Sequence, residues 1–479
     1  MTTLQRELRP FVSSVAILLL SASPAAAQSE RLSFGPAVFS AEGDRTTDVD
    51  TATLLVPANR AVPGSRGVVT IPIVRFRSTA GQPGAPIVYL SGGTGSGIAA
   101  ARGPRFAMFL ALRELGDVIT FDLRGAGRST PRVDCGAGPA LDVTQPIGYD
   151  SLAGALNRYA TRCADSLRRA GVDLAGHNVR EVVEDVESLR RALNVPRIRL
   201  VGISTGSQLA LEYLRRHGSR VDAVVAAGVQ APDQNMHMPA DQEAVVRALA
   251  AGLRARDTAS ADLIASLRSV LDTLGAEPRV VAVATPRGDT VRVSLGAFDV
   301  QLLVSATLGD RRQMSMMAGL AGQAARGNFG PFAMMKLGAA RQGITSAFEA
   351  LMDCQTGAPV ERARLAATQS RTALLGRATL DFPEACAGWG VAPLDGSYRE
   401  PVRSTGRVLL ISGTLDGRTP PRNADDALAH LRNGVHLVVT GASHGDDLFL
   451  GSPEIVATML RLFRGDSLGS SRRIEIAIP

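Results

Sequence analysis

The sequence predicts an α/β fold: a mostly parallel sheet with helices on both faces and an inserted, mainly helical segment. Short β-rich runs alternate with helical stretches in both outer parts of the chain, and the alternation stops between about residues 232 and 403. A serine flanked by glycines directly follows one apolar run. The expected strands are 51–57, 68–76, 87–90, 118–122, 198–203, 221–226, 407–411 and 435–439.

Two helices are expected between these strands. Over 179–193 the apolar residues recur near the 3.6-residue period, and 205–217 ends at Gly218, a typical helix stop.

Residues 232–403 interrupt this pattern with further helices, for example at 242–254 and 261–274. They also contain a hairpin pattern, 280–285 and 290–295, turning at Arg287-Gly288-Asp289. Because strand 407–411 resumes the sheet pattern, we expect an inserted lid rather than a separate tandem domain.

Composition excludes several classes of protein. The chain of 479 residues is 45% hydrophobic, which is enough apolar material for a large core and excludes a disordered or collagen-like chain. The net charge is +7, carried almost entirely by arginine, with no run of five like charges. The sequence therefore lacks the basic arm typical of a nucleic-acid partner.

The N-terminus has the pattern of a secretory signal peptide. Arg6 and Arg9 precede the apolar run 11–20, and three alanines follow before Gln28. The run is short for a transmembrane span, so we expect export without stable membrane insertion. The predicted organisation is signal peptide 1–27, first core part 28–231, lid 232–403, second core part 404–465 and tail 466–479.

Export to a periplasmic or extracellular compartment favours disulfides among the four cysteines. Three pairings are possible, and no pair has zinc-ligand spacing. We favour the two sequence-local pairs, Cys135 with Cys163 and Cys354 with Cys386.

A candidate nucleophile stands between strand 198–203 and helix 205–217, in Gly202-Ile203-Ser204-Thr205-Gly206. The Gly-x-Ser-x-Gly motif is weak alone, but between a strand and a helix it predicts a nucleophile elbow. There the tight turn exposes the serine Oγ, and the helix N-terminus favours a developing anion.

A serine needs a base that an acid holds in place, and after such an elbow the acid precedes the histidine along the chain. His444 follows strand 435–439 in a glycine-flanked loop, and Asp416 follows strand 407–411. The other late histidines, His430 on an expected helix and His436 at a strand start, are expected to be packing or surface residues. Asp425 and Asp426 are expected within a helix. The predicted triad is therefore Ser204, Asp416 and His444.

An oxyanion hole requires two backbone N–H groups. Thr205, directly after the nucleophile, should supply one. Gly93 or Thr94 should supply the other, from a loop that also contains Gly92 and Gly95 and follows strand 87–90. A phosphate-binding loop is the rival interpretation, but the sequence lacks its Gly-Lys-Ser/Thr ending.

These motifs resemble the α/β-hydrolase superfamily, specifically its exported tripeptidyl/prolyl aminopeptidase branch. Residues 122–129 resemble the branch's Asp-x-Arg-Gly-x-Gly-x-Ser turn, 202–217 its nucleophile region and 413–420 its acid loop. The four cysteine positions are also similar. The resemblance extends over about 45–465, is strong in the core and thin in the lid, and implies a serine peptidase acting on peptide N-termini.

The sequence departs from that branch at three positions. Thr94 replaces the usual proline of the glycine loop, Ala227 stands where an Asp is usual, and Thr356 stands where an acidic residue is common. An exopeptidase needs a carboxylate for the substrate α-ammonium, because a buried unpaired charge is costly. Candidates are Asp233, Glu349 and Asp353.

The prediction is an exported serine hydrolase that releases residues or short peptides from peptide N-termini through an acyl-enzyme on Ser204. A carboxylesterase or amidase without a free-amine requirement is the first alternative, and a non-catalytic binding protein on a hydrolase scaffold the second. The expected partner is a peptide or small ester, and no metal or organic cofactor is implied.

Overall fold

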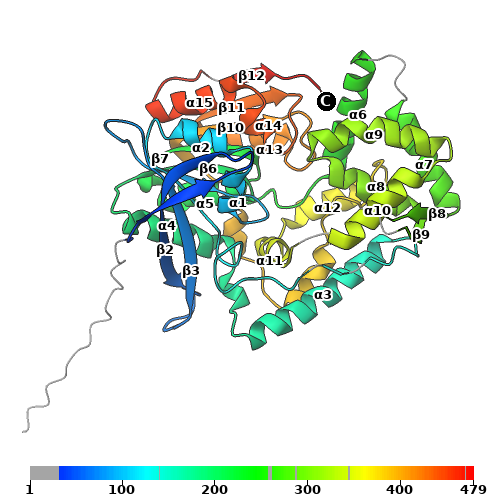
Figure 1. Cartoon of the computed structure of the whole chain (residues 1–479), viewed down its shortest axis with the longest axis horizontal. Coiled ribbons are helices and arrows are strands. Elements are labelled where there is room, and N and C mark those ends of the chain that lie inside the picture. Colours follow the sequence, from blue (N-terminus) through cyan, green and yellow to red (C-terminus); the bar gives the residue numbers. More distant parts are fainter. Residues whose placement is uncertain are drawn as a thin grey trace, which may run out of the picture.

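The computed structural model describes residues 32–478, except 137, 140, 257–261, 286–287, 343–345 and 470. The predicted signal peptide, residues 1–27, lies outside this range. Figure 1 shows a sheet with its covering helices beside a second group of helices formed by the middle of the chain.

One ten-stranded sheet organises the structure, in the order β1-β2-β3-β5-β4-β6-β7-β10-β11-β12. The first three strands pair antiparallel, and the strands from β5 to β12 pair parallel. The strands are β1 (Gly35–Ser40), β2 (Thr46–Pro57), β3 (Val68–Phe76), β4 (Ile87–Leu90), β5 (Val118–Phe121), β6 (Ile198–Ser204), β7 (Val221–Val229), β10 (Ser404–Gly413), β11 (Leu431–Thr440) and β12 (Ser471–Glu475).

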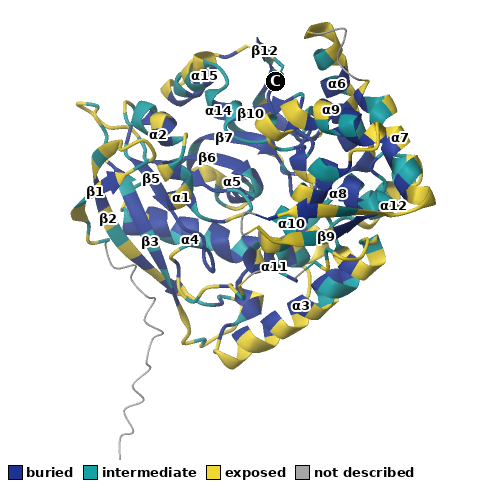
Figure 2. Ribbon diagram, turned by 45° about the vertical axis from the view of Figure 1, so that its right-hand side comes forward, coloured by how far each residue is buried: buried dark blue, intermediate teal, exposed yellow. Residues whose placement is uncertain are grey.

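Alternate residues of the central strands enter two apolar cores, one on each face of the sheet. Val88 and Leu200 belong to one core, and their neighbours Tyr89 and Val201 belong to the other. Figure 2 shows these strands buried between the helix layers. One core includes α4 (Val179–Ala192), α5 (Thr205–His217) and α13 (Pro421–Leu428); the other includes α1 (Gly97–Arg102), α2 (Phe106–Leu112), α14 (Asp447–Leu450) and α15 (Pro453–Arg464).

The chain between β7 and β10 forms the second group of helices, coloured green to yellow in Figure 1, and it has its own apolar core. We refer to residues 232–403 as the insertion. Its elements are α6 (Pro239–Arg256), α7 (Leu263–Ala276), β8 (Arg279–Ala284), β9 (Thr290–Leu295), α8 (Ala297–Thr307), α9 (Arg311–Ala325), α10 (Gly330–Gln342), α11 (Ala347–Thr356), α12 (Val360–Gln369), η3 (Pro383–Trp389) and η4 (Gly396–Arg399).

Helix α3 (Tyr149–Arg169) precedes the insertion in sequence but packs with it, because Leu152 and Leu156 share an apolar cluster with Leu302 and Ala378. The disulfides are Cys135–Cys163, between the chain after β5 and α3, and Cys354–Cys386, between α11 and η3. They match the sequence-local pairing expected above.

Every expected strand is present, and the hairpin is β8–β9, of whose turn Arg287 lies outside the described residues. Two strands went unpredicted: β1, at the antiparallel edge, and β12, which adds part of the tail to the opposite edge. Among the described helices, none is long and apolar enough to cross a membrane.

Candidate active site

Ser204 occupies a strained turn between β6 and α5. Its backbone has φ 56° and ψ −126°, and positive φ is uncommon for a residue with a side chain. The flanking glycines make this turn sterically possible. A Cβ at Gly202 would overlap the carbonyl of Gly206, and one at Gly206 would overlap the carbonyl of Leu90. The turn therefore has the backbone geometry expected of a nucleophile elbow.

His444 and Asp416 form a hydrogen-bonded pair on the loops after β11 and β10. His444 Nδ1 lies 2.9 Å from Asp416 Oδ2, and the Thr419 hydroxyl donates to the same oxygen over 2.7 Å. The backbone N–H groups of Arg418 and Thr419 donate to Asp416 Oδ1 over 2.9 and 2.8 Å.

These contacts keep the fully buried Asp416 ionised. Burial raises the pKa of its carboxyl, but the charge of His444 and the hydrogen bonds outweigh burial, so the pKa is lowered. An ionised Asp416 accepts the Nδ1 proton of His444, and Nε2 is then free to act as a base.

Gly228 adjoins this pair at the end of β7. Its φ is +52°, and a Cβ there would lie 3.0 Å from Thr419 Oγ1 and 3.1 Å from His444 Cε1. Glycine at this position lets His444 and Thr419 approach the backbone closely.

Ser204 and His444 both line one cavity of about 930 Å³ between the sheet and the insertion. Thr205, Gly92, Gly93 and Thr94 line it too. A Cβ on Gly92 would lie 3.1 Å from Ser204 Cβ, which places the glycine loop against Ser204. The structure thus places Ser204, the predicted oxyanion-hole segments and the His444–Asp416 pair at one cavity.

Two of the three candidate amine-binding carboxylates reach this cavity. Glu349 and Asp353 are four residues apart on α11, hence on one helix face, and both line the cavity. A Cβ on Gly93 would overlap Glu349 Oε1, so this carboxylate adjoins the glycine loop. Asp353 is an exposed residue of the cavity wall, and desolvation by the surrounding protein, Glu349 and Asp381 together raise the pKa of its carboxyl well above the usual value.

Asp233 is not among the residues that line the cavity. Burial raises the pKa of its carboxyl, and the charges that act on this pKa are those of Arg362, Asp426 and His430. The expectation that Asp233 could bind the substrate amine therefore finds no geometric support.

Sequence reasoning missed a second histidine–carboxylate pair in the cavity wall. Asp381 accepts the backbone N–H of His237 over 2.8 Å and lies 2.9 Å from its Nδ1. No motif surrounds either residue, and 144 positions separate them.

The other late histidines lie away from the cavity. His436, inside β11, hydrogen bonds to Ser412 and Asp425. His430, expected on a helix, lies in the turn after α13, which ends at Leu428. Asp425 and Asp426 are in α13, as expected.

Most charges in the cavity wall are paired. Arg105 pairs with Asp446 at 2.7 Å, Lys336 with Asp299 at 2.9 Å, and His237 with Asp381. Within the described part of the chain, the lining residues whose charged groups have no ion pair are Glu349, Asp353 and Arg418. The wall thus presents two carboxyl groups on α11 and one guanidinium after Asp416 that have no ion pair.

The mostly parallel sheet and the strand–elbow–helix at Ser204 define the class of protein: a hydrolase of the α/β type. The chain belongs to the alpha/beta hydrolase fold family, whose model matches residues 85–446.

Named relatives are more distant. Serine protease Hip1 of Mycobacterium tuberculosis is 25% identical over 176 residues, 35% of this chain and 33% of that protein. Proline iminopeptidase of Arabidopsis thaliana is 26% identical over 183 residues, 38% of this chain and 37% of that protein. The matches thus span little more than a third of these relatives. A crystal structure of proline iminopeptidase from Mycobacterium smegmatis aligns with 86% of this chain and with 98% of its own length. The sequence identity is 16% and the TM-score is 0.43.

Proposed function

We propose that the protein is an exported serine peptidase that releases residues or short peptides from peptide N-termini. The observation that carries the proposal is the unpaired carboxylates of Glu349 and Asp353, in the same cavity as Ser204 and His444. Partial similarity to a serine protease and a proline iminopeptidase supports the same class.

In this mechanism Ser204 Oγ attacks the substrate carbonyl while His444 Nε2 takes its proton. Asp416 holds the imidazole in the required tautomer and stabilises the imidazolium. The N–H of Thr205, with that of Gly93 or Thr94, stabilises the oxyanion. His444 then protonates the leaving amine, and water releases the acyl group from Ser204.

The carboxylates would define the enzyme as an exopeptidase. A substrate N-terminus carries a positive charge that loses its water in the cavity, and Glu349 and Asp353 would compensate that charge. Glu349 adjoins Gly93, beside the nucleophile, so a bound ammonium would lie close to the scissile carbonyl. The insertion would act as the lid that closes this side of the cavity.

The test compares peptide anilides with a free or an acetylated N-terminus, beside p-nitrophenyl esters. We expect acetylation to lower kcat/KM by about a hundredfold or more, since it leaves two carboxylates without a cation. Glu349→Gln and Asp353→Asn should reduce turnover of the free-amine substrate and narrow this difference. Equal rates for both anilides, with fast ester turnover, would identify a carboxylesterase and refute the peptidase proposal.

A further inference from the structure

We propose that Arg418 binds a carboxylate on the leaving half of the substrate, so that the preferred substrates are short peptides with an acidic group directly after the scissile bond. This inference rests on the proposed function and extends it to the leaving group of the substrate.

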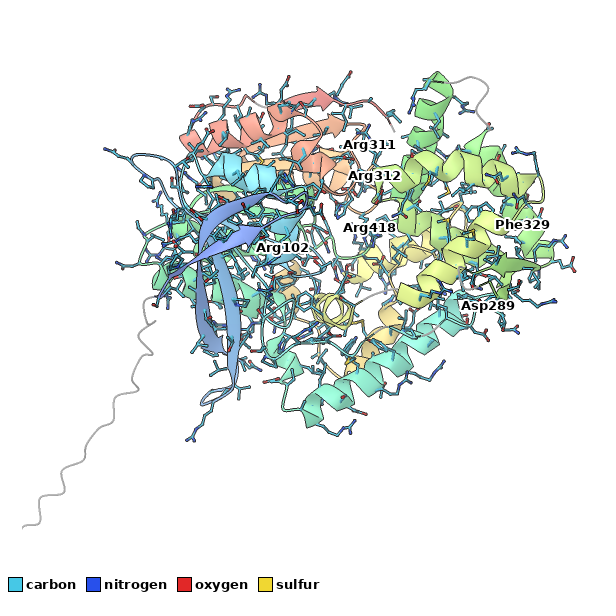
Figure 3. All side chains as sticks on the ribbon, viewed as in Figure 1. Arg102, Asp289, Arg311, Arg312, Phe329 and Arg418 are labelled. Atoms are coloured by element: carbon cyan, nitrogen blue, oxygen red, sulfur yellow. A yellow bond between two sulfur atoms is a disulfide. The ribbon has the colours of Figure 1, made fainter. Side chains whose placement is uncertain are left out.

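Arg418 lies next to the proposed base. A Cβ built on Gly309, in the insertion, would lie 2.8 Å from Arg418 Nε and 3.6 Å from His444 Cβ. Both side chains therefore approach Gly309 of the insertion, and both line the cavity. Figure 3 shows Arg418 in the seam between the sheet and the insertion, below Arg311 and Arg312.

Three carboxylates in the neighbourhood of Arg418, those of Asp416, Asp310 and Asp446, are engaged with other groups. Asp416 bonds to His444 and Thr419, and its contact with Arg418 comes from the backbone N–H. Asp310 accepts N–H groups at the start of α9, and Asp446 pairs with Arg105. The guanidinium of Arg418 thus faces the cavity without a counter-ion among the described residues.

The insertion holds the Arg418 loop in place. The N–H of Gly417 donates to the carbonyl of Leu308 over 3.0 Å, and a Cβ on Gly417 would lie 2.6 Å from Leu308 Cβ. The backbone at residues 416–419 is also fixed by its hydrogen bonds to Asp416. A guanidinium on a fixed loop can bind a carboxylate through two parallel hydrogen bonds.

The unpaired groups adjoin different parts of the site. Glu349 adjoins Gly93, and Gly92 adjoins Ser204, so the Glu349 carboxyl group lies beside the glycine loop. Arg418 adjoins His444, which gives its proton to the leaving amine. In a leaving amino acid the α-carboxylate is separated from that amine by a single carbon, which brings it toward Arg418. A side-chain carboxylate of the leaving residue offers the same chemistry.

The experiment uses the acyl part that gives the fastest anilide turnover, coupled to three leaving groups: alanine, alanine amide, and aspartic acid α-amide. For the wild type we expect kcat/KM for the peptide with alanine as leaving group to exceed that for the peptide with alanine amide about tenfold or more. A charge-assisted hydrogen bond to the carboxylate provides a gain of this size. The aspartic acid amide separates a side-chain carboxylate from the terminal one. A preference for either acidic leaving group over alanine amide supports the proposal.

In Arg418→Gln the ratio of kcat/KM for the alanine leaving group to kcat/KM for the alanine amide leaving group should fall to nearly one. Arg418→Lys should restore part of this ratio. Arg312→Gln, a change of an exposed arginine on α9 outside the cavity wall, is the matched control and should keep the wild-type ratio. The ratio is measured within each variant, so a loss of folded enzyme does not change it.

A wild-type ratio near one for both acidic leaving groups, or an unchanged ratio in Arg418→Gln, would overturn the assignment of Arg418. The anilides contain no carboxylate, so their dependence on a free amine still tests the proposed function separately. If neither anilides nor peptides are cleaved, both proposals fail.

Discussion

Gly228 sets the position of the proposed catalytic base, and Gly228→Ala perturbs that position with a single methyl group. The added Cβ would lie 3.0 Å from Thr419 Oγ1 and 3.1 and 3.2 Å from His444 Cε1 and Nδ1. Ordinary carbon contacts are about 3.5 to 4.0 Å, so the imidazole must move by about 0.5 Å. Residue 228 must also keep its φ of +52°, which costs a residue with a side chain about 1 kcal/mol.

A displacement of about 1 Å in a catalytic group can lower the rate about a hundredfold, so half of it should lower kcat about tenfold. The backbone strain alone would change stability but not the rate of the folded enzyme. The assay is kcat on a free-amine anilide, normalised to the active sites that a fluorophosphonate titrates.

Gly218→Ala is the control, because Gly218 has φ −54° and no atom lies within 4 Å of a Cβ built there. It should keep the wild-type kcat. If Gly228→Ala retained the wild-type kcat within twofold, His444 would not be the base at this position, or its position would not matter to the reaction.

Three further predictions follow from the same structure. Asp416→Asn should lower kcat about 10⁴-fold, because the wrong imidazole tautomer is then favoured; circular dichroism should show an unchanged fold, and a loss below tenfold would argue against its role. Desolvation, Glu349 and Asp381 raise the folded-state pKa of Asp353, so the folded protein loses stability as pH rises through that pKa. In urea unfolding, the free energy of unfolding of Asp353→Asn should therefore fall less over this pH range than that of the wild type. Parallel plots of the free energy of unfolding against pH for the two proteins would contradict this. Replacing Cys354 and Cys386 by alanine opens a loop of 32 residues and should lower the free energy of unfolding by about 3 kcal/mol in urea titrations; no change would show that the crosslink does not constrain the unfolded chain.

The sequence predicts the sheet well where its strands are buried on both faces. All four residues of β4 are buried, and such runs appear as continuous apolar segments. The edge strands have no such signal. β1 is largely exposed, and β12 reads Ser-Arg-Arg-Ile-Glu, so its pairing with β11 depends on tertiary context.

The residues of the site also differ in how far the sequence predicts them. The elbow is a local motif, because Gly202 and Gly206 relieve clashes within a few residues of Ser204 or with the adjacent β4. The charged residues of the cavity wall, in contrast, come from distant parts of the sequence. Asp381 and His237 meet only in the folded chain, and the free state of Arg418 depends on which carboxylates other residues engage.

Covalent labelling by a fluorophosphonate, followed by peptide mass spectrometry, tests most directly whether Ser204 is an activated nucleophile. We expect one adduct per chain, on the peptide that contains Ser204, with labelling abolished in Ser204→Ala and strongly slowed in His444→Ala. An unlabelled wild-type protein, or an adduct that persists in Ser204→Ala, would contradict this expectation.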